Sequence, residues 1–384
     1  MVNRCTVLLS VAPWLLCSLA LFAQEDATQE APGDRTSKLS MHGFLSQAYV
    51  RSDGFQLLGI PEDGTADYRD MALQFRYAMS PRDTFIVQLS HTRKGRSLVQ
   101  PLREDIELDW AFYQHGFDHG TYLKVGRIPM PIGIYNEIRD VGTLLPFYSP
   151  PFSVYSEDRF AAEQIDGLLV SHRFGPNSPW ELGVDVYGGG WSMIEASVGY
   201  AQPARADVRD AFGMQLWLST PVSGLRFGLG ANRFDVSGGL FRVGESDRWE
   251  AEFFSIDGDF DRFLIRAELY HRELPLALAG GRGLDAKSDS YYLQLGYRLG
   301  SWAIYVQGER SELRASLANL LTFNADLWED YALALTYAFH ANIVLKVEIH
   351  DNESYFTENV IGGNFLVDPP SETTYGLTSL SVSF

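Results

Sequence analysis

The charged side chains with the clearest functional pattern occupy alternate positions of short apolar segments. Lys346 and Glu348 interrupt the apolar segment 343–349, where Leu345 and Val347 fall on the opposite face. Ionic groups on one face of a strand are costly against lipid but reasonable on a face that meets water. The chemistry open to these residues is electrostatic contact with a solute that passes along a wet surface, and no bond needs to form or break.

Residue patterns that would indicate catalysis or metal binding are weak. Ser90 and His91 are adjacent, and in a strand consecutive side chains point to opposite faces, which argues against a nucleophile and its base. Of the eight histidines only His115 and His119 lie close together, at a strand end and a turn, where solvation explains them more simply. No glycine-rich phosphate loop precedes a helix. The sequence therefore predicts no catalytic residue, no metal site and no cofactor.

Short alternating segments, rich in aromatic residues, repeat after residue 40 to the C-terminus. They number about sixteen, each of roughly 9 to 12 residues, and long loops alternate with short turns, as in bacterial outer-membrane barrels. In one of them Leu333 and Leu335 share a face opposite Ala334 and Thr336. This pattern predicts an all-β fold, a transmembrane antiparallel β-barrel. A secreted β-sandwich or β-propeller also alternates, but the long and short connections favour the barrel.

One connection, residues 128–160, is far longer than the turns. Pro129 and Pro131 cannot donate to a sheet ladder, so the preceding strand is expected to end there. The apolar side chains that follow, such as Ile134 and Phe147, argue against a disordered linker. We expect this connection to fold into the lumen of the barrel and to narrow it. A surface loop packed on itself, or one that covers a neighbouring subunit, is the alternative.

The N-terminal residues are expected to direct export rather than to fold. Residues 1–23 have a positive start and an apolar core, as in a secretory signal peptide, and residues 24–40 form a polar lead-in to the barrel of residues 41–384. Cys5 and Cys17 both fall in the signal segment, so the exported chain is expected to contain no disulfide. The net charge of -18 argues against nucleic acid as a partner.

Three places in the chain resemble a known family of membrane proteins. Residues 375–384 alternate and end in Phe384, which resembles the terminal strand that signals to the barrel-insertion machinery of bacterial outer membranes. The segment KVGRIPMPIG at 124–133 and the hairpin at 331–348 resemble the phosphate-selective-porin-like family of trimeric, sixteen-stranded porins. The resemblance implies passive transport and a homotrimer. It does not extend to phosphate selectivity, which needs a dense ladder of lumen arginines and lysines.

Charged side chains are expected at the lumen in two places, on the inward faces of strands and within or beside the long connection. Basic and acidic residues nearly cancel, so we expect no strong charge preference. The charged residues within or beside the long connection could line a constriction, or could form ion pairs that anchor the loop to the wall. The candidate pore-lining or constriction residues are Arg76, Glu107, Asp109, Lys124, Arg127, Glu137, Arg139, Asp140, Arg159, Arg266, Glu268, Arg298, Glu309, Lys346 and Glu348.

The function expected from these observations is that of a bacterial outer-membrane porin, through which small hydrophilic solutes or ions diffuse passively. Its expected partners are outer-membrane lipid, these solutes, the other copies of a homotrimer and the barrel-insertion machinery. Other functions remain open. They are a plugged structural or adhesive barrel, a barrel-embedded hydrolase, for which no nucleophile and base are found, and a transporter of hydrophobic compounds, which would need an apolar lumen or an N-terminal plug.

Overall fold

A computed structural model describes most of the chain. The described residues are 38–97, 100, 105–155, 163–176, 178–195, 204–238, 247–278, 282–317, 321–355 and 371–384. The expected signal peptide, most of the polar lead-in and Arg159 lie outside them. Within these ranges, no helix has both the length and the apolar character needed to cross a membrane.

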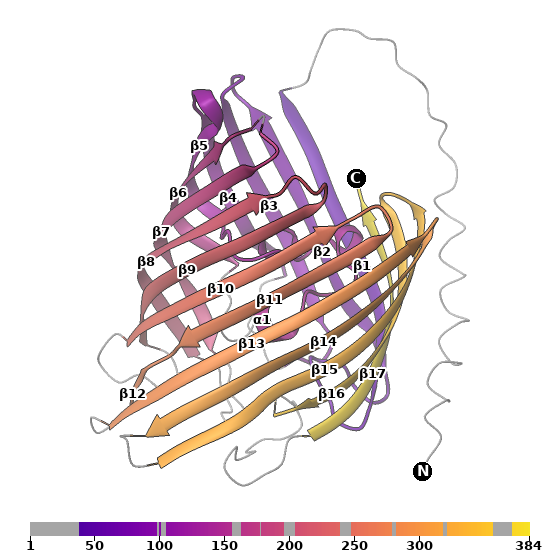
Figure 1. The fold of residues 1–384 in the computed structure, drawn as a ribbon. Helices are drawn as coiled ribbons and strands as arrows, with labels where there is room; N and C mark the ends of the chain where they lie inside the picture. The colour runs from indigo at the N-terminus through magenta and orange to yellow at the C-terminus, as the bar shows by residue number, and fades with distance from the viewer. Residues whose placement is uncertain are drawn as a thin grey trace.

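A single antiparallel sheet closes on itself to form a barrel (Figure 1). The closure occurs where β1 (Leu39–Asp53) pairs with β2 (Thr65–Ala78) on one side and with β17 (Ser371–Ser383) on the other. The short β12 (Leu276–Leu278) continues β11 (Phe263–Glu273) along the same neighbour, β13, so the described wall contains sixteen strands. The predicted all-β antiparallel barrel is confirmed.

The remaining described elements follow in chain order, and long connections alternate with short ones. They are β3 (Asp83–Lys94), β4 (Glu107–Gly116), η4 (Asp118–Gly120), β5 (Thr121–Pro129), η5 (Asn136–Ile138), η6 (Gly142–Leu144), α1 (Phe152–Tyr155), β6 (Gln164–Phe174), β7 (Glu181–Glu195), β8 (Ala204–Ser219), β9 (Leu225–Gly238), β10 (Asp247–Asp259), β13 (Arg282–Leu299), β14 (Trp302–Leu317), β15 (Leu321–His340) and β16 (Ile343–Ser354).

The two faces of the wall differ in polarity, as the sequence pattern predicts. On β15, Leu333 and Leu335 are 44% and 45% exposed, whereas Ala334 between them is buried. On β16, Lys346 and Glu348 are buried in the interior of the barrel. Apolar side chains therefore cover the outer surface and charged ones point inward, which keeps charge away from hydrocarbon.

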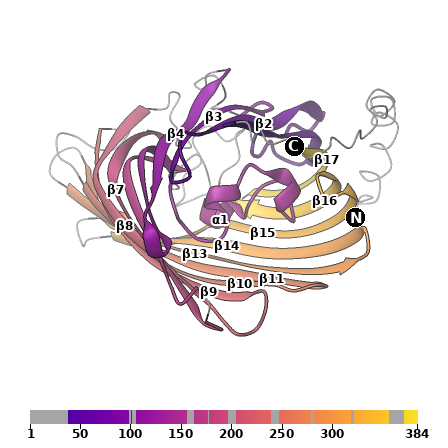
Figure 2. The same ribbon diagram turned by 90° about the horizontal axis from the view of Figure 1, so that it is seen from above.

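The long loop, residues 130–163, connects β5 to β6, and its described part lies within the barrel. Figure 2, seen from above, places α1 of this loop inside the ring of strands. Tyr135 and Phe147 of the loop are fully buried, at 0% and 1% exposure, because they pack against the inner face of the wall. The hydrophobic clusters of the barrel thus lie between this loop and the surrounding strands.

Candidate functional site

Glu268, on the inner face of β11, holds the first part of the long loop. Its carboxylate accepts hydrogen bonds from Ile134 N at 3.0 Å and from the Tyr292 hydroxyl at 2.8 Å. The hydroxyls of Tyr155 and Ser255 donate to the same carboxylate. Burial raises the pKa of Tyr155 well above its ordinary value, so this phenol stays protonated and donates. Donors from the loop and from two neighbouring strands therefore converge on one buried side chain.

Tyr135 attaches the same part of the loop to the wall. Its hydroxyl accepts a hydrogen bond from Arg266 Nη1 at 3.1 Å and donates to the side chain of Gln294. Burial raises the pKa of Tyr135, so it too remains a neutral donor. Arg266 is also paired with Asp257, with Nε 2.9 Å from Oδ1. Arg266 and Glu268 both face the interior, where they hold the loop in place.

The second part of the loop is attached to β14 and β16. Glu309 Oε2 accepts a hydrogen bond from Ser153 N at 2.7 Å, and Lys346 Nζ donates to the carbonyl of Phe147 at 2.6 Å. These bonds give sheet-side partners to backbone groups of the loop. Glu309 and Lys346, both candidates for the pore lining, therefore act as attachment points for the loop.

Arg139 binds one part of the loop to another. It is 3% exposed, donates to the Asn136 side chain at 3.1 Å and to the Tyr155 carbonyl at 2.5 Å, and lies 3.6 Å from Glu163. The sequence is compatible with two roles for the charges of this loop, pore lining or anchoring. The contacts of Arg139 are those of an anchor.

Arg127 lies on the outer face of the barrel, which corrects its assignment to the pore. β5 continues through Arg127 to Pro129, so this side chain shares the outer face with Val125, which is 46% exposed. Arg127 Nε lies 2.8 Å from Asp166 Oδ1 on the neighbouring β6. Its position beside the loop made Arg127 a candidate for the constriction, whereas the two-residue period of a strand places it outside.

Replacing Arg127 with leucine is expected to lower the free energy of unfolding by about 1–2 kcal/mol, because Asp166 would lose its ion pair on an apolar face. The double replacement Arg127→Leu and Asp166→Leu is expected to recover most of this loss, since it leaves no unpaired charge. Denaturant titration in lipid vesicles measures both effects. Single-channel conductance is expected to stay unchanged in both variants. A changed conductance in the double variant would show that Arg127 faces the pore.

Several charged side chains remain accessible inside the described part of the barrel. Lys124 Nζ lies 3.8 Å from Glu137 Oε1, and the Glu137 side chain is 53% exposed. Arg76 is exposed near the end of β2. Arg298 of β13 is partly exposed and pairs with Asp259 at 2.6 Å. Charges of both signs therefore meet the open part of the lumen.

A group of carboxylates lies where the loop meets β3 and β4. Glu107, Asp109 and Asp140 line one small crevice there. Gln88 Nε2 donates to Asp109 at 2.7 Å, so this carboxylate has a partner in the wall. Within the described ranges, no group of three or more histidine, cysteine or acidic side chains could hold a metal ion.

Neutralising Glu137 or Lys124 is expected to shift ion selectivity in opposite directions. A unit charge about 8 Å from a passing ion in water contributes about 0.5 kcal/mol, which corresponds to about a twofold change in relative permeability. Glu137→Gln should therefore favour anions, and Lys124→Met should favour cations. Reversal potentials under a salt gradient measure both. Shifts of the same sign would show that these two side chains do not face the ion path.

Sequence reasoning missed the uncharged side chains that complete the attachment of the loop. Candidates were selected by charge, and hydroxyl and amide groups carry no such signal. Strand alternation could have placed Ser255, Tyr292 and Gln294 on the inner face, whereas the contacts of Tyr155 depend on how the loop folds. Gly142 was also missed. A Cβ at Gly142 would lie 2.2 Å from Ser46 Oγ, so glycine allows this close approach.

The closed barrel with a loop against its inner wall has the architecture of an outer-membrane porin. The outer membrane channel DcaP of Acinetobacter baumannii has this fold, with 10% sequence identity and a TM-score of 0.58 over 90% of this chain and 97% of that chain. The anion-selective porin from Comamonas acidovorans is similar, with 11% identity and a TM-score of 0.55 over 90% of this chain and 99% of that chain. The in-vitro folded outer membrane protein OmpT of Vibrio cholerae, in its trimer form, has 11% identity and a TM-score of 0.53 over the same shares of the two chains.

These likenesses show the fold alone, because the sequence identities are low. No protein-family model matches the chain, and the comparison with curated proteins finds no match. What the barrel transports therefore has to be argued from its own residues.

Proposed function

We propose that the chain is an outer-membrane porin, a passive channel for small hydrophilic solutes or ions. The observation that carries this proposal is the long loop, which Glu268 and Glu309 hold against the inner wall while Glu137, beside Lys124, stays accessible. Such a loop narrows a water-filled barrel, so it limits the size of the solutes that pass. The mixed signs of the accessible charges support a channel without strong charge preference.

We also propose that residues 1–23 are a cleaved signal peptide, that the C-terminal strand directs insertion and that three copies form a homotrimer. The resemblance to phosphate-selective-porin-like proteins supports this proposal, as does the trimer form of the Vibrio cholerae barrel. Phosphate selectivity is not included. Arg266 is engaged by Asp257 and Tyr135, and Lys346 is engaged by the carbonyl of Phe147, so neither is free to bind phosphate.

Single-channel recording in a planar bilayer tests the porin function. We expect stepwise openings, grouped in threes for a trimer, and a reversal potential close to zero under a salt gradient. A barrel that is folded by circular dichroism and by heat-dependent gel mobility, but that passes no current, would contradict the proposal.

A plugged structural or adhesive barrel is the second candidate, because the loop contacts well-separated strands. Gln215 of β8 donates to the Gly133 carbonyl at 3.2 Å, whereas Thr143 donates to Ser383 of β17 at 3.1 Å. A loop fixed to different sides of a barrel can block it. Swelling of liposomes in sugars of graded size separates the candidates, since a porin gives rates that fall with solute size and a plugged barrel gives none.

A further inference from the structure

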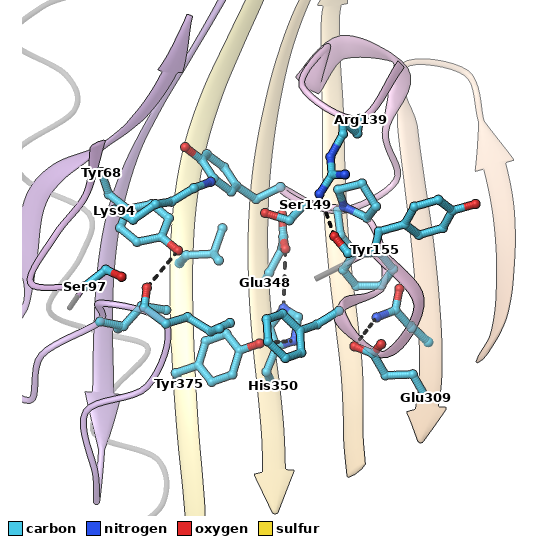
Figure 3. Close-up of a pocket in the computed structure, with 18 residues that line it drawn as sticks. Tyr68, Lys94, Ser97, Arg139, Ser149, Tyr155, Glu309, Glu348, His350 and Tyr375 are labelled. Atoms are coloured by element: carbon cyan, nitrogen blue, oxygen red, sulfur yellow. Dashed lines mark hydrogen bonds and ion pairs between the residues drawn. The ribbon is translucent and has the colours of Figure 1, made fainter. Parts of the chain in front are cut away.

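We propose that a cavity between the long loop and the wall binds a small organic cation that carries a primary ammonium group. The cavity has a volume of about 100 Å³, and its lining includes Tyr68, Tyr148, Glu348, His350 and Tyr375 (Figure 3). This binding site goes beyond passive passage and does not require the barrel to conduct.

Glu348 supplies the main argument, because one of its oxygens lacks a donor. Its side chain is 1% exposed, and Oε2 lies 3.4 Å from His350 Nε2, whereas Oε1 has no hydrogen-bond partner among the described residues. The other ring nitrogen of His350 lies 2.8 Å from Asp330 and 3.0 Å from the Tyr375 hydroxyl, so the ring is held in place. A buried carboxylate oxygen without a donor is unfavourable, and a ligand N–H group would satisfy it.

The aromatic side of the cavity already contacts one ammonium group of the chain itself. Lys94 Nζ lies 5.4 Å from the ring centroid of Tyr68 and 5.2 Å from that of Tyr148. Asp70 serves as its counter-ion at 2.8 Å. Ring faces attract cations, and this attraction strengthens when the cation leaves water. The same wall therefore offers an environment in which ammonium groups are stabilised.

The charges of the lining favour a cation over an anion. The three basic side chains of the lining, Lys94, Arg139 and His350, each have an acidic partner outside the cavity. Glu309 and Glu348 add two carboxylates to the lining, and Figure 3 shows Glu348 between Lys94 on one side and Glu309 on the other. An anionic ligand would meet both carboxylates. A primary ammonium can donate to Glu348 while its carbon chain contacts the aromatic rings.

Isothermal titration calorimetry on the folded full-length barrel in detergent micelles tests this proposal. The probes are butylammonium, 1-butanol and butyrate, which differ in charge but hardly in size. We expect butylammonium to bind about tenfold or more tightly than the other two, because it alone offers a charged donor. Equal binding of the three probes to the unmodified protein would overturn the proposal, and this comparison needs no variant.

Two variants show where the probe binds. Glu348→Gln is expected to weaken butylammonium binding about tenfold, since it removes the charged acceptor. Asp185→Asn removes an inward carboxylate of β7 that lies outside the cavity lining and is expected to leave binding unchanged. Unaltered binding in a folded Glu348→Gln variant would overturn the proposal. A silent barrel that binds butylammonium would contradict the porin function alone.

Discussion

Replacing Glu268 with alanine is expected to raise the single-channel conductance and to lower the free energy of unfolding by about 2–4 kcal/mol. The substitution removes the acceptor for Ile134 N and for the hydroxyls of Tyr155, Ser255 and Tyr292. A buried donor without a partner costs about 1–3 kcal/mol, and the loop donors avoid this cost if they move to water. A loop that leaves the wall widens the lumen, so the current per channel rises.

Ser255→Ala is the matched control for this substitution. It removes one wall hydroxyl from the same carboxylate and leaves the bonds from Ile134 and Tyr155 in place. We expect a stability loss of about 1 kcal/mol and no change in conductance. Planar-bilayer recording and denaturant titration in lipid vesicles measure both quantities. If Glu268→Ala lost stability but kept the original conductance, the loop would not determine the width of the pore.

The wall could be predicted from the sequence because lipid and a wet interior impose opposite polarity on alternate side chains. Leu333 and Leu335 face outward, and Lys346 and Glu348 face inward, on strands where the two-residue period is regular. The same period also places Arg127 outside the barrel, because β5 continues as far as Pro129. Arg127 became a constriction candidate only because it flanks the long loop, although the strand expected from the sequence already contained it.

Alternation fails where a strand contains an extra residue. The pairing of β3 with β4 shifts between Gln88 and Leu89, which leaves Asp109 without a partner in the ladder. Asp109 and Trp110 are consecutive, yet both are buried. Such a bulge turns the following side chains to the other face of the sheet, and the residue types around it do not predict it. The inward position of Trp110 therefore requires the structure.

The attachment of the loop could not be predicted because its partners are far apart in the sequence. Ser153 and Glu309 are separated by 156 positions, and Phe147 and Lys346 by 199. The sequence indicates a long apolar loop and a charged inner wall. Which charge meets which loop atom depends on the closed ring, where strands distant in the chain face one lumen.

A disulfide between the loop and the wall is expected to form in the double variant Thr143→Cys and Ser383→Cys. Thr143 Oγ1 and Ser383 Oγ are 3.1 Å apart, so cysteine sulfurs at these positions can reach bonding distance with small side-chain rotations. The native cysteines, Cys5 and Cys17, lie in the expected signal peptide and would not compete after cleavage. The mobility of the unfolded chain in a gel, with and without reductant, measures the cross-link, and Thr143→Cys alone is the control.

When this disulfide is combined with Glu268→Ala, it is expected to cancel the gain in conductance. The cross-link keeps the loop on the wall although the Glu268 carboxylate, which accepted the loop's hydrogen bonds, is gone. The oxidised triple variant should conduct like the unmodified protein, and the reduced form should conduct more. If the cross-link fails to form in a folded barrel, Thr143 does not rest on β17. If it forms and the raised conductance persists, the gain from Glu268→Ala arises away from the loop, and the loop is not the element that narrows the lumen.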